Sequence, residues 1–138
     1  MKKEKLSTNI YNEFIDGLNI IGIKLIYSEA EVKEGFSPPA QIFTEEKKSY
    51  KKLEDNKFIV KHEYKLSGNK KGEEEGFFIN VIYDVTYKSK IPITRKVFDI
   101  FSEISLPLHT WPYFRQFVHE MTARMGLPPL ILDLLKLE

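Results

Sequence analysis

The chain has 138 residues with a net charge of +1, and 42% of its residues are hydrophobic. This length fits one globular domain, and the balanced charge argues against a nucleic-acid-binding protein. The absence of Cys excludes disulfides, thiol catalysis and Cys-based metal sites.

The N-terminus predicts neither a secretory signal nor a membrane anchor. Polar residues from Ser7 onward interrupt the sequence before any apolar stretch of the roughly 7–15 residues that a signal peptide needs. No segment approaches the ~20 apolar residues of a membrane-spanning helix. We therefore expect a soluble cytoplasmic protein that needs no cofactor and does not insert into membranes.

Residues 7–17 predict a short helix, because Ser7 can cap its first turn and Gly17 can end it. Residues 18–32 change to the alternation of apolar and polar residues that is typical of a strand. The side chains expected on one face of this strand are Ile21, Ile23, Leu25 and Tyr27.

Residues 33–41 contain Gly35 and the Pro38-Pro39 pair, which predict a loop. Residues 42–53 hold few apolar side chains among many Lys and Glu. We expect an irregular strand there, at an edge of the sheet, because Lys-rich edges hinder pairing with another sheet.

The clearest strands are residues 57–67 and 77–88, separated by a hydrophilic loop over residues 68–76. Long neighbouring strands joined by a polar loop should pair antiparallel. The side chains expected on the buried face are Phe58, Val60, His62, Tyr64 and Leu66 in the first strand, and Phe77, Ile79, Val81, Tyr83, Val85 and Tyr87 in the second.

The last third of the chain has a helical period. Thr94 can cap a helix over residues 95–105, and the Leu-Pro pair that follows should end it. Pro112 suits the first turn of a second helix over residues 112–125, and Gly126 can end that helix. Strands followed by helices predict one α+β domain, a four-stranded antiparallel sheet with helices packed on one face.

Residues 127–138 form a very apolar tail that begins Leu-Pro-Pro-Leu-Ile-Leu. A chain end is usually polar and frayed, so this segment should be covered by the sheet, by another subunit or by a bound partner. Ten Phe, seven Tyr and one Trp make 13% of the residues aromatic. We expect part of this aromatic surface to serve binding.

The side chains that could carry catalysis form no known constellation. Three Glu residues at 73–75 lie in a Gly-flanked loop, where a charge run is usually solvated. His62, His109 and His119 lack the spacing of a metal site, and His62 on an apolar strand face should be a hydrogen-bonded core residue. The sequence has no nucleophile elbow and no Gly-rich phosphate loop, so we expect no enzyme.

The segment from residue 108 to residue 130 resembles the SecB family of export chaperones. The family pattern is an aromatic-Pro-Tyr-x-Arg segment that opens the main helix, followed by a helix end at Gly, then Pro and aliphatic residues. The matching residues here are Trp111, Pro112, Tyr113, Arg115, Gly126, Pro128 and Leu130. The order of strands and helices is compatible with this family over most of the remaining chain.

The resemblance implies a SecB-like fold and a homotetramer built as a dimer of dimers. It also implies ATP-independent binding of unfolded or non-native polypeptides, which keeps them competent for translocation. The client groove would lie between the sheet, the loop after the first strand and the C-terminal segment. The corresponding groove residues are Tyr27, Phe36, Pro38, Phe43, Trp111, Leu130, Leu132, Leu134 and Leu135, while Pro112, Tyr113, Arg115, Gly126 and Pro128 would be structural.

Two departures from the family affect the expected partners. SecB proteins are typically acidic and dock the translocase motor SecA through an acidic sheet surface, whereas this chain carries balanced charge. The family also ends in a long helix that covers the groove, and because the chain stops at Glu138 we expect that helix to be short or missing. A SecB-like chaperone of a toxin–antitoxin module is therefore an alternative to an export chaperone.

Two further interpretations do not need a chaperone. The sheet and helices could enclose a small-molecule or enzyme pocket, with His62, Tyr64 and Asp84 as converging polar groups. Alternatively, the apolar tail could simply seal the subunits of a structural oligomer. An apolar groove open to solvent would favour the chaperone, and a closed polar pocket would favour the enzyme or carrier.

Overall fold

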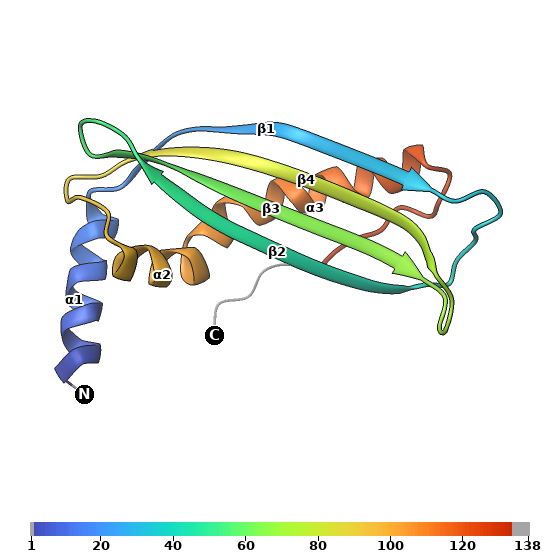
Figure 1. Ribbon diagram of the computed structural model, residues 1–138, viewed down its shortest axis with the longest axis horizontal. Coiled ribbons are helices and arrows are strands. Elements are labelled where there is room, and N and C mark those ends of the chain that lie inside the picture. Colours follow the sequence, from blue (N-terminus) through green and yellow to red (C-terminus); the bar gives the residue numbers. More distant parts are fainter. Residues whose placement is uncertain (1, 134–138) are drawn as a thin grey trace.

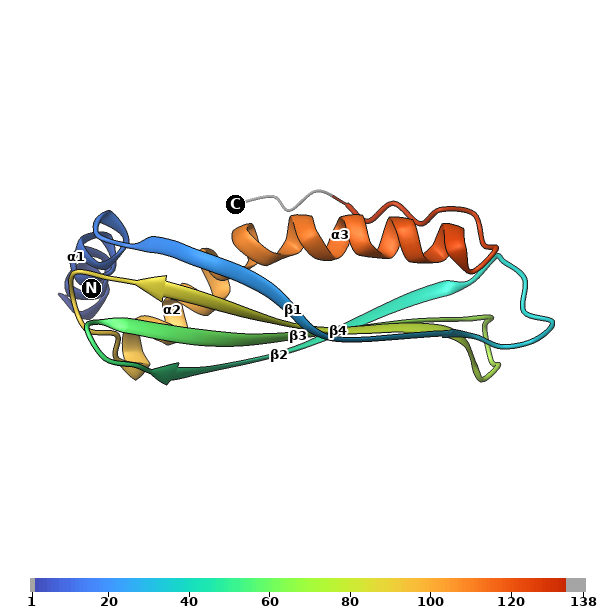
Figure 2. The ribbon, with the colours of Figure 1, turned by 90° about the horizontal axis from the view of Figure 1, so that it is seen from above.

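The computed structural model describes residues 2–133, with side chains from residue 9 onward. The elements are α1 (Lys2–Asp16), β1 (Asn19–Val32), β2 (Gln41–Lys52), β3 (Lys57–Asn69), β4 (Glu75–Lys88), α2 (Arg95–Ile104) and α3 (Leu106–Arg124). The strands form one antiparallel sheet in the order β1-β4-β3-β2, which confirms the predicted α+β fold. Figures 1 and 2 show α3 running along one face of this sheet, with α1 beside one end of the strands.

The buried face of the sheet centres on β3 and β4. These strands pair antiparallel, and alternate residues are buried along both of them. The predicted buried face is therefore confirmed, from Phe58 to Leu66 and from Phe77 to Tyr87. Burial of a large apolar side chain contributes roughly 1.5–3 kcal/mol, so the central hairpin supplies a large share of the core.

β1 departs from the alternation expected from its sequence. Its pairing with β4 shifts register at two points, which leaves Ile21 and Ile26 as extra residues in two bulges. Directly opposed residues of antiparallel strands lie on the same face. Leu25 lies opposite a buried residue of β4, whereas Tyr27 lies opposite Ile82 on the other face. The prediction that Leu25 and Tyr27 share a face is therefore wrong.

β2 is more regular than its sequence predicted. It pairs with β3 along its whole 12-residue length with no shift of register. An edge strand needs only occasional apolar side chains, and β2 supplies Tyr50, whose ring packs on Phe98 of α2 with centroids 4.4 Å apart. The many Lys and Glu side chains hid this regular alternation, because they occupy exposed positions on both faces.

α1 and α2 pack together at one end of the sheet. α1 begins earlier than the predicted start at residue 7, and it contributes the fully buried Phe14. The Phe14 ring lies 5.9 Å from the rings of Phe58 and Phe101, measured between centroids. Thr94 caps α2 as predicted, because its Oγ1 accepts the amide of Val97 at 3.2 Å.

α3 begins at Leu106, directly after α2, so the predicted start of the second helix near residue 112 is wrong. Pro107 lies in the first turn of α3, where backbone N–H groups have no acceptor within the helix, so the absent N–H of proline costs no hydrogen bond. Pro112 lies inside the helix, and the carbonyl of Leu108 therefore lacks its usual helical donor. No helix within residues 2–133 has the length and apolar content needed to cross a membrane.

Candidate peptide-binding groove

The end of α3 turns the chain back along the helix. Gly126 has a φ of +79°, a left-handed conformation that favours glycine. The amide of Leu127 donates to the carbonyl of Thr122 at 3.0 Å, and the amide of Gly126 donates to the carbonyl of Ala123 at 3.1 Å. These two bonds form the Schellman arrangement, and the predicted helix end at Gly126 is confirmed.

Residues 127–133, called the tail below, are held against α3 through their main chain. Three hydrogen bonds join them to helix side chains: Trp111 Nε1 donates to the Asp133 carbonyl (2.9 Å), Arg115 Nε donates to the Leu132 carbonyl (2.6 Å), and the Leu130 amide donates to Thr122 Oγ1 (2.9 Å). The helix positions are four and seven residues apart and thus lie on one side of α3. The tail therefore runs antiparallel to the helix, as Figure 1 shows.

An apolar groove of about 210 Å³ lies between the loop after β1 and the tail. The loop and the start of β2 form one wall, and the end of α3 and the tail form the other. The lining residues are Phe36, Pro38, Ala40, Ile42, Phe77, Thr122, Leu127, Pro128, Pro129 and Leu130. Thr122 alone in this lining has a polar side chain, and its hydroxyl already bonds to the amide of Leu130.

Phe36 is placed in the groove by close packing on the central hairpin. Its ring lies 5.6 Å from that of Phe77, between centroids. A Cβ at Gly76 would lie 2.2 Å from the Phe36 ring, and a Cβ at Gly68 would lie 2.1 Å from the Phe77 ring. Glycine at both positions therefore lets the two rings lie directly on the sheet backbone.

The structure brings part of the predicted groove together. Phe36, Pro38 and Leu130 line the same cavity, with Pro128 beside them. Trp111 and Leu132 meet farther along the tail, where Leu132 is buried and Trp111 packs 5.8 Å from Tyr64 and from Phe114. The predicted positions Leu134 and Leu135 lie outside the described residues.

Tyr27 and Phe43 lie on the face of the sheet opposite to the helices, called the open face below. For Tyr27 the cause is the bulge at Ile26, which reverses the alternation of β1. For Phe43 the cause is its register, because it lies opposite Ser67 of β3 and not opposite a buried residue. The prediction that Tyr27 and Phe43 line the groove with Phe36 is therefore wrong, and the reason lies in the strand register.

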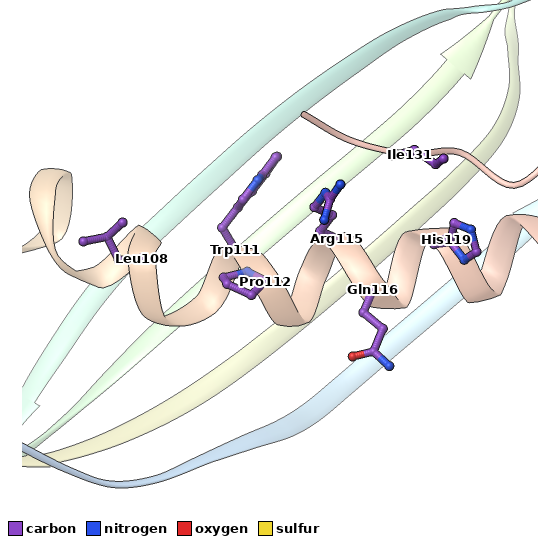
Figure 3. Close-up of a pocket in the computed structure, with 7 residues that line it drawn as sticks. All are labelled: Leu108, Trp111, Pro112, Arg115, Gln116, His119 and Ile131. Atoms are coloured by element: carbon purple, nitrogen blue, oxygen red, sulfur yellow. The ribbon is translucent and has the colours of Figure 1, made fainter. Parts of the chain in front are cut away.

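A larger cavity of about 600 Å³ follows the exposed side of α3. Figure 3 shows its side chains along the helix, with Ile131 reaching in from the neighbouring tail. The lining residues are Leu108, Trp111, Pro112, Arg115, Gln116, His119 and Ile131. The sequence contained a signal for it, because positions 108, 112, 116 and 119 share one side of a helix once α3 begins at residue 106.

His62 lies in a closed polar network between the sheet and α3. The ring is fully buried, its Nε2 lies 2.9 Å from Glu46 Oε2, and its Nδ1 lies 2.9 Å from Thr110 Oγ1. The Tyr64 hydroxyl lies 2.7 Å from the same Oγ1. Both ring nitrogens therefore have partners, and the prediction of a satisfied core histidine is confirmed.

Burial lowers the pKa of His62 below its ordinary value of 6.5, so the ring is neutral at pH 7. A carboxylate only accepts hydrogen bonds, so Nε2 carries the proton toward Glu46 and Nδ1 accepts from the Thr110 hydroxyl. The hydrogen bond from His62 lowers the pKa of Glu46 and keeps that carboxyl ionised. This arrangement ties β2, β3 and α3 together without offering a free acid or base.

The polar groups of the alternative enzyme pocket do not converge. His62 and Tyr64 face the helices, whereas Asp84 lies opposite Lys61 and Lys24 on the open face. Among residues 9–133, no group of three His, Asp or Glu side chains is arranged to hold a metal ion. The geometry thus offers apolar binding surface in place of the proposed pocket.

Comparison with known proteins identifies the fold. No family model and no curated protein matches this sequence. The structure is similar to that of the Mycobacterium tuberculosis SecB-like chaperone Rv1957, solved in complex with a ChAD peptide from the antitoxin Rv1956 HigA1. The TM-score is 0.82 at 17% identity, covering 94% of this chain and 99% of that chain. A Streptococcus agalactiae protein of unknown function also matches, with a TM-score of 0.46 at 10% identity over 85% of this chain and 97% of that one. The chain therefore has the fold of a SecB-like chaperone.

Proposed function

We propose that this protein is a chaperone that binds extended apolar segments of non-native polypeptides, without ATP. The observation that carries the proposal is the apolar groove between Phe36 and Leu130, built in a fold that a peptide-binding chaperone shares. Such a groove recognises apolar surface and makes few directional demands on sequence. Such a groove suits a protein that binds many different polypeptides and catalyses no reaction on them.

The groove is formed before a client arrives. Pro38 stands in one wall and Pro128 and Pro129 stand in the other, and a proline ring fixes the backbone φ angle. The main-chain bonds from Trp111 and Arg115 further restrain the tail. Preformed walls lose little conformational entropy on binding, which leaves more of the burial free energy for affinity.

Two kinds of client fit the groove. An export chaperone would hold preproteins for translocation, whereas a dedicated chaperone would hold an antitoxin, as the similar structure with its antitoxin peptide illustrates. The charge of the open face favours the dedicated chaperone, because Lys24, Lys47 and Lys61 lie on this face together with acidic side chains and balance their charge. That face lacks the acidic character by which SecB proteins dock SecA, so we propose an antitoxin-like client before an export client.

The test is suppression of aggregation. The full chain, mixed at equal molar ratio with a chemically denatured protein on dilution, should slow the rise of light scattering. Phe36→Ser should weaken this effect at least several-fold, because Phe36 lines the groove. Phe43→Ser is the matched control, since Phe43 is an exposed aromatic residue on the open face. The proposal fails if the unaltered chain does not slow aggregation, or if both variants act alike while remaining folded by circular dichroism.

A further inference from the structure

The free edge of β2 presents unpaired main-chain groups beside the groove. The amide of Leu53 donates to the carbonyl of Lys57 at 2.8 Å, which fixes the phase of the hydrogen bonds between β2 and β3. Bonded and non-bonded positions alternate along an antiparallel pair. It follows that the amides and carbonyls of alternate β2 residues point away from the sheet, at Ile42, Thr44, Glu46, Lys48 and Tyr50.

These outward groups have no partner within the described part of the chain. No main-chain or side-chain hydrogen bond from residues 9–133 reaches the backbone of residues 42–50 from outside the sheet. Long exposed edges usually carry bulges, Pro or Lys that hinder pairing. β2 has no bulge and no Pro over its 12 residues, and its lysines repel another basic edge but not a strand that carries carboxylates, so it can accept such a strand.

A strand added to β2 would meet the groove. Ile42 has an outward-pointing backbone, faces the helices and lines the groove with Leu127 and Leu130. Strands in a sheet lie about 4.8 Å apart, and opposed residues share a face. The side chains of an added strand that lie opposite Ile42 and Thr44 would therefore enter the space in front of the tail.

The charge of β2 selects among extended segments. Its second half carries Lys47, Lys48, Lys51 and Lys52, of which Lys48 already bonds to Glu46 and to the Ser102 carbonyl. The other three are exposed. They would favour carboxylates on the part of a client strand that lies beyond the groove.

We propose that the client binds by adding a strand to the free edge of β2, with its apolar part opposite Ile42 and Thr44 and acidic residues beside the lysines. The proposal rests on the proposed chaperone function and specifies its client as an extended apolar segment flanked by carboxylates. Main-chain pairing makes binding tolerant of sequence, and the groove and lysines add a preference.

The first test uses synthetic peptides with the full chain. The unmodified peptide has ten residues: a first half of five residues in which apolar and polar side chains alternate, and a second half rich in Glu. Two further copies are N-methylated, one at its even-numbered amides and the other at its odd-numbered amides, and their binding is compared with that of the unmodified peptide. Only one set of amides in a strand faces its neighbour. We expect one methylated peptide to lose at least about tenfold in affinity by fluorescence anisotropy, while the other binds within about twofold.

The role of charge and the role of the β2 edge are tested separately. A peptide with Lys in place of Glu should bind several-fold more weakly at low salt, and the difference should shrink as salt rises. Thr44→Pro removes an outward amide without touching the bonds to β3, and should weaken the unmodified peptide about tenfold. Thr44→Ala is its matched control, and circular dichroism and thermal melting establish that both variants fold.

The outcomes separate this proposal from the proposed function. If the unmodified peptide binds but both methylated peptides bind equally well, strand addition is overturned and the chaperone function stands. If the unmodified peptide does not bind and aggregation is not slowed, both fail. A third outcome is that Thr44→Pro changes the mass of the assembly while the peptide does not compete with self-association. In that case the edge of β2 pairs with a second copy of the chain, and the proposal is overturned.

Discussion

The two edges of the sheet are built differently. β1 is interrupted by two bulges and exposes the large apolar side chains Ile20, Ile21, Leu25, Ile26 and Tyr27. β2 runs without a shift of register; it exposes Ile42 and Phe43 at its start and several Lys and Glu side chains from Glu45 onward. The bulges of β1 hinder strand pairing along that edge, so its exposed apolar side chains can be buried only by packing against another surface. The regular edge of β2 offers main-chain hydrogen bonds to an added strand, and its charged side chains determine which strand binds best. The contrast indicates that β1 suits apolar association and β2 suits an extended segment.

The largest expected effect comes from detaching β2 from the helical layer. His62→Ala would leave Glu46 and Thr110 without their partner and open a void, at a cost of about 2–4 kcal/mol in the free energy of unfolding. Ser28→Ala on exposed β1 should change that energy by no more than about 0.5 kcal/mol. Urea unfolding measures both variants, and equal effects would contradict the asymmetry.

Acid should weaken the same junction. The folded pKa of His62 is lowered by burial, so the unfolded chain takes up a proton first as pH falls through 6.5. Stability is therefore full above pH 6.5 and falls below it, by at most roughly 1.4 kcal/mol per pH unit. The lowered pKa of Glu46 adds stability that is present above 4.5 and lost as pH falls through its folded pKa.

His62→Gln provides the control for this pH dependence. Urea unfolding of the unaltered chain at pH 7, 6 and 5 should show a declining free energy of unfolding, and the variant should show a flatter profile across that range. A profile that is the same in both chains would remove His62 as the cause.

A smaller effect is expected at the wall of the groove that faces β2. Trp111→Phe keeps an aromatic ring but removes the Nε1–H bond to the Asp133 carbonyl, a loss of about 1 kcal/mol. Faster hydrogen exchange at the Leu130 amide should report the loosened tail. Tyr113→Phe, at an exposed position of the same helix, should leave that exchange unchanged.

The smallest effect on stability is expected at β1. Ile26→Ser in the second bulge should change the free energy of unfolding by less than about 0.5 kcal/mol, because the side chain is already exposed. We propose that this edge takes part in self-association, so native mass measurement should show a smaller assembly. Lys47→Ser on β2 should leave the mass unchanged, and a reversed result would exchange the roles of the two edges.

The central strands were predictable because both of their faces obey a simple period. Alternation in β3 and β4 showed the buried positions, and Gly126 marked the end of α3. The bulges of β1 were not predictable, because Ile21 and Ile26 are apolar residues within an apolar run. One extra residue leaves no trace in such a run, yet it moves Tyr27 to the opposite face.

The candidate groove was predictable only in part. Its loop and tail residues were recognisable from the family resemblance, and Phe36, Pro38 and Leu130 do meet. The clamp on the tail was not visible, because Trp111 and Arg115 bond to main-chain carbonyls that every sequence shares. The start of α3 was not predictable, because a Leu-Pro pair is compatible both with the end of one helix and with the first turn of the next, and Pro107 lies in that first turn.

The two walls of the groove come from opposite ends of the synthesis order. The loop with Phe36 is made first, and Leu127 to Leu130 follow much later along the chain. Until the tail has docked on Thr122, the second wall is incomplete. A growing chain therefore has no finished groove in which to sequester its own apolar segments, and the proposed client binding would begin only after the tail has docked.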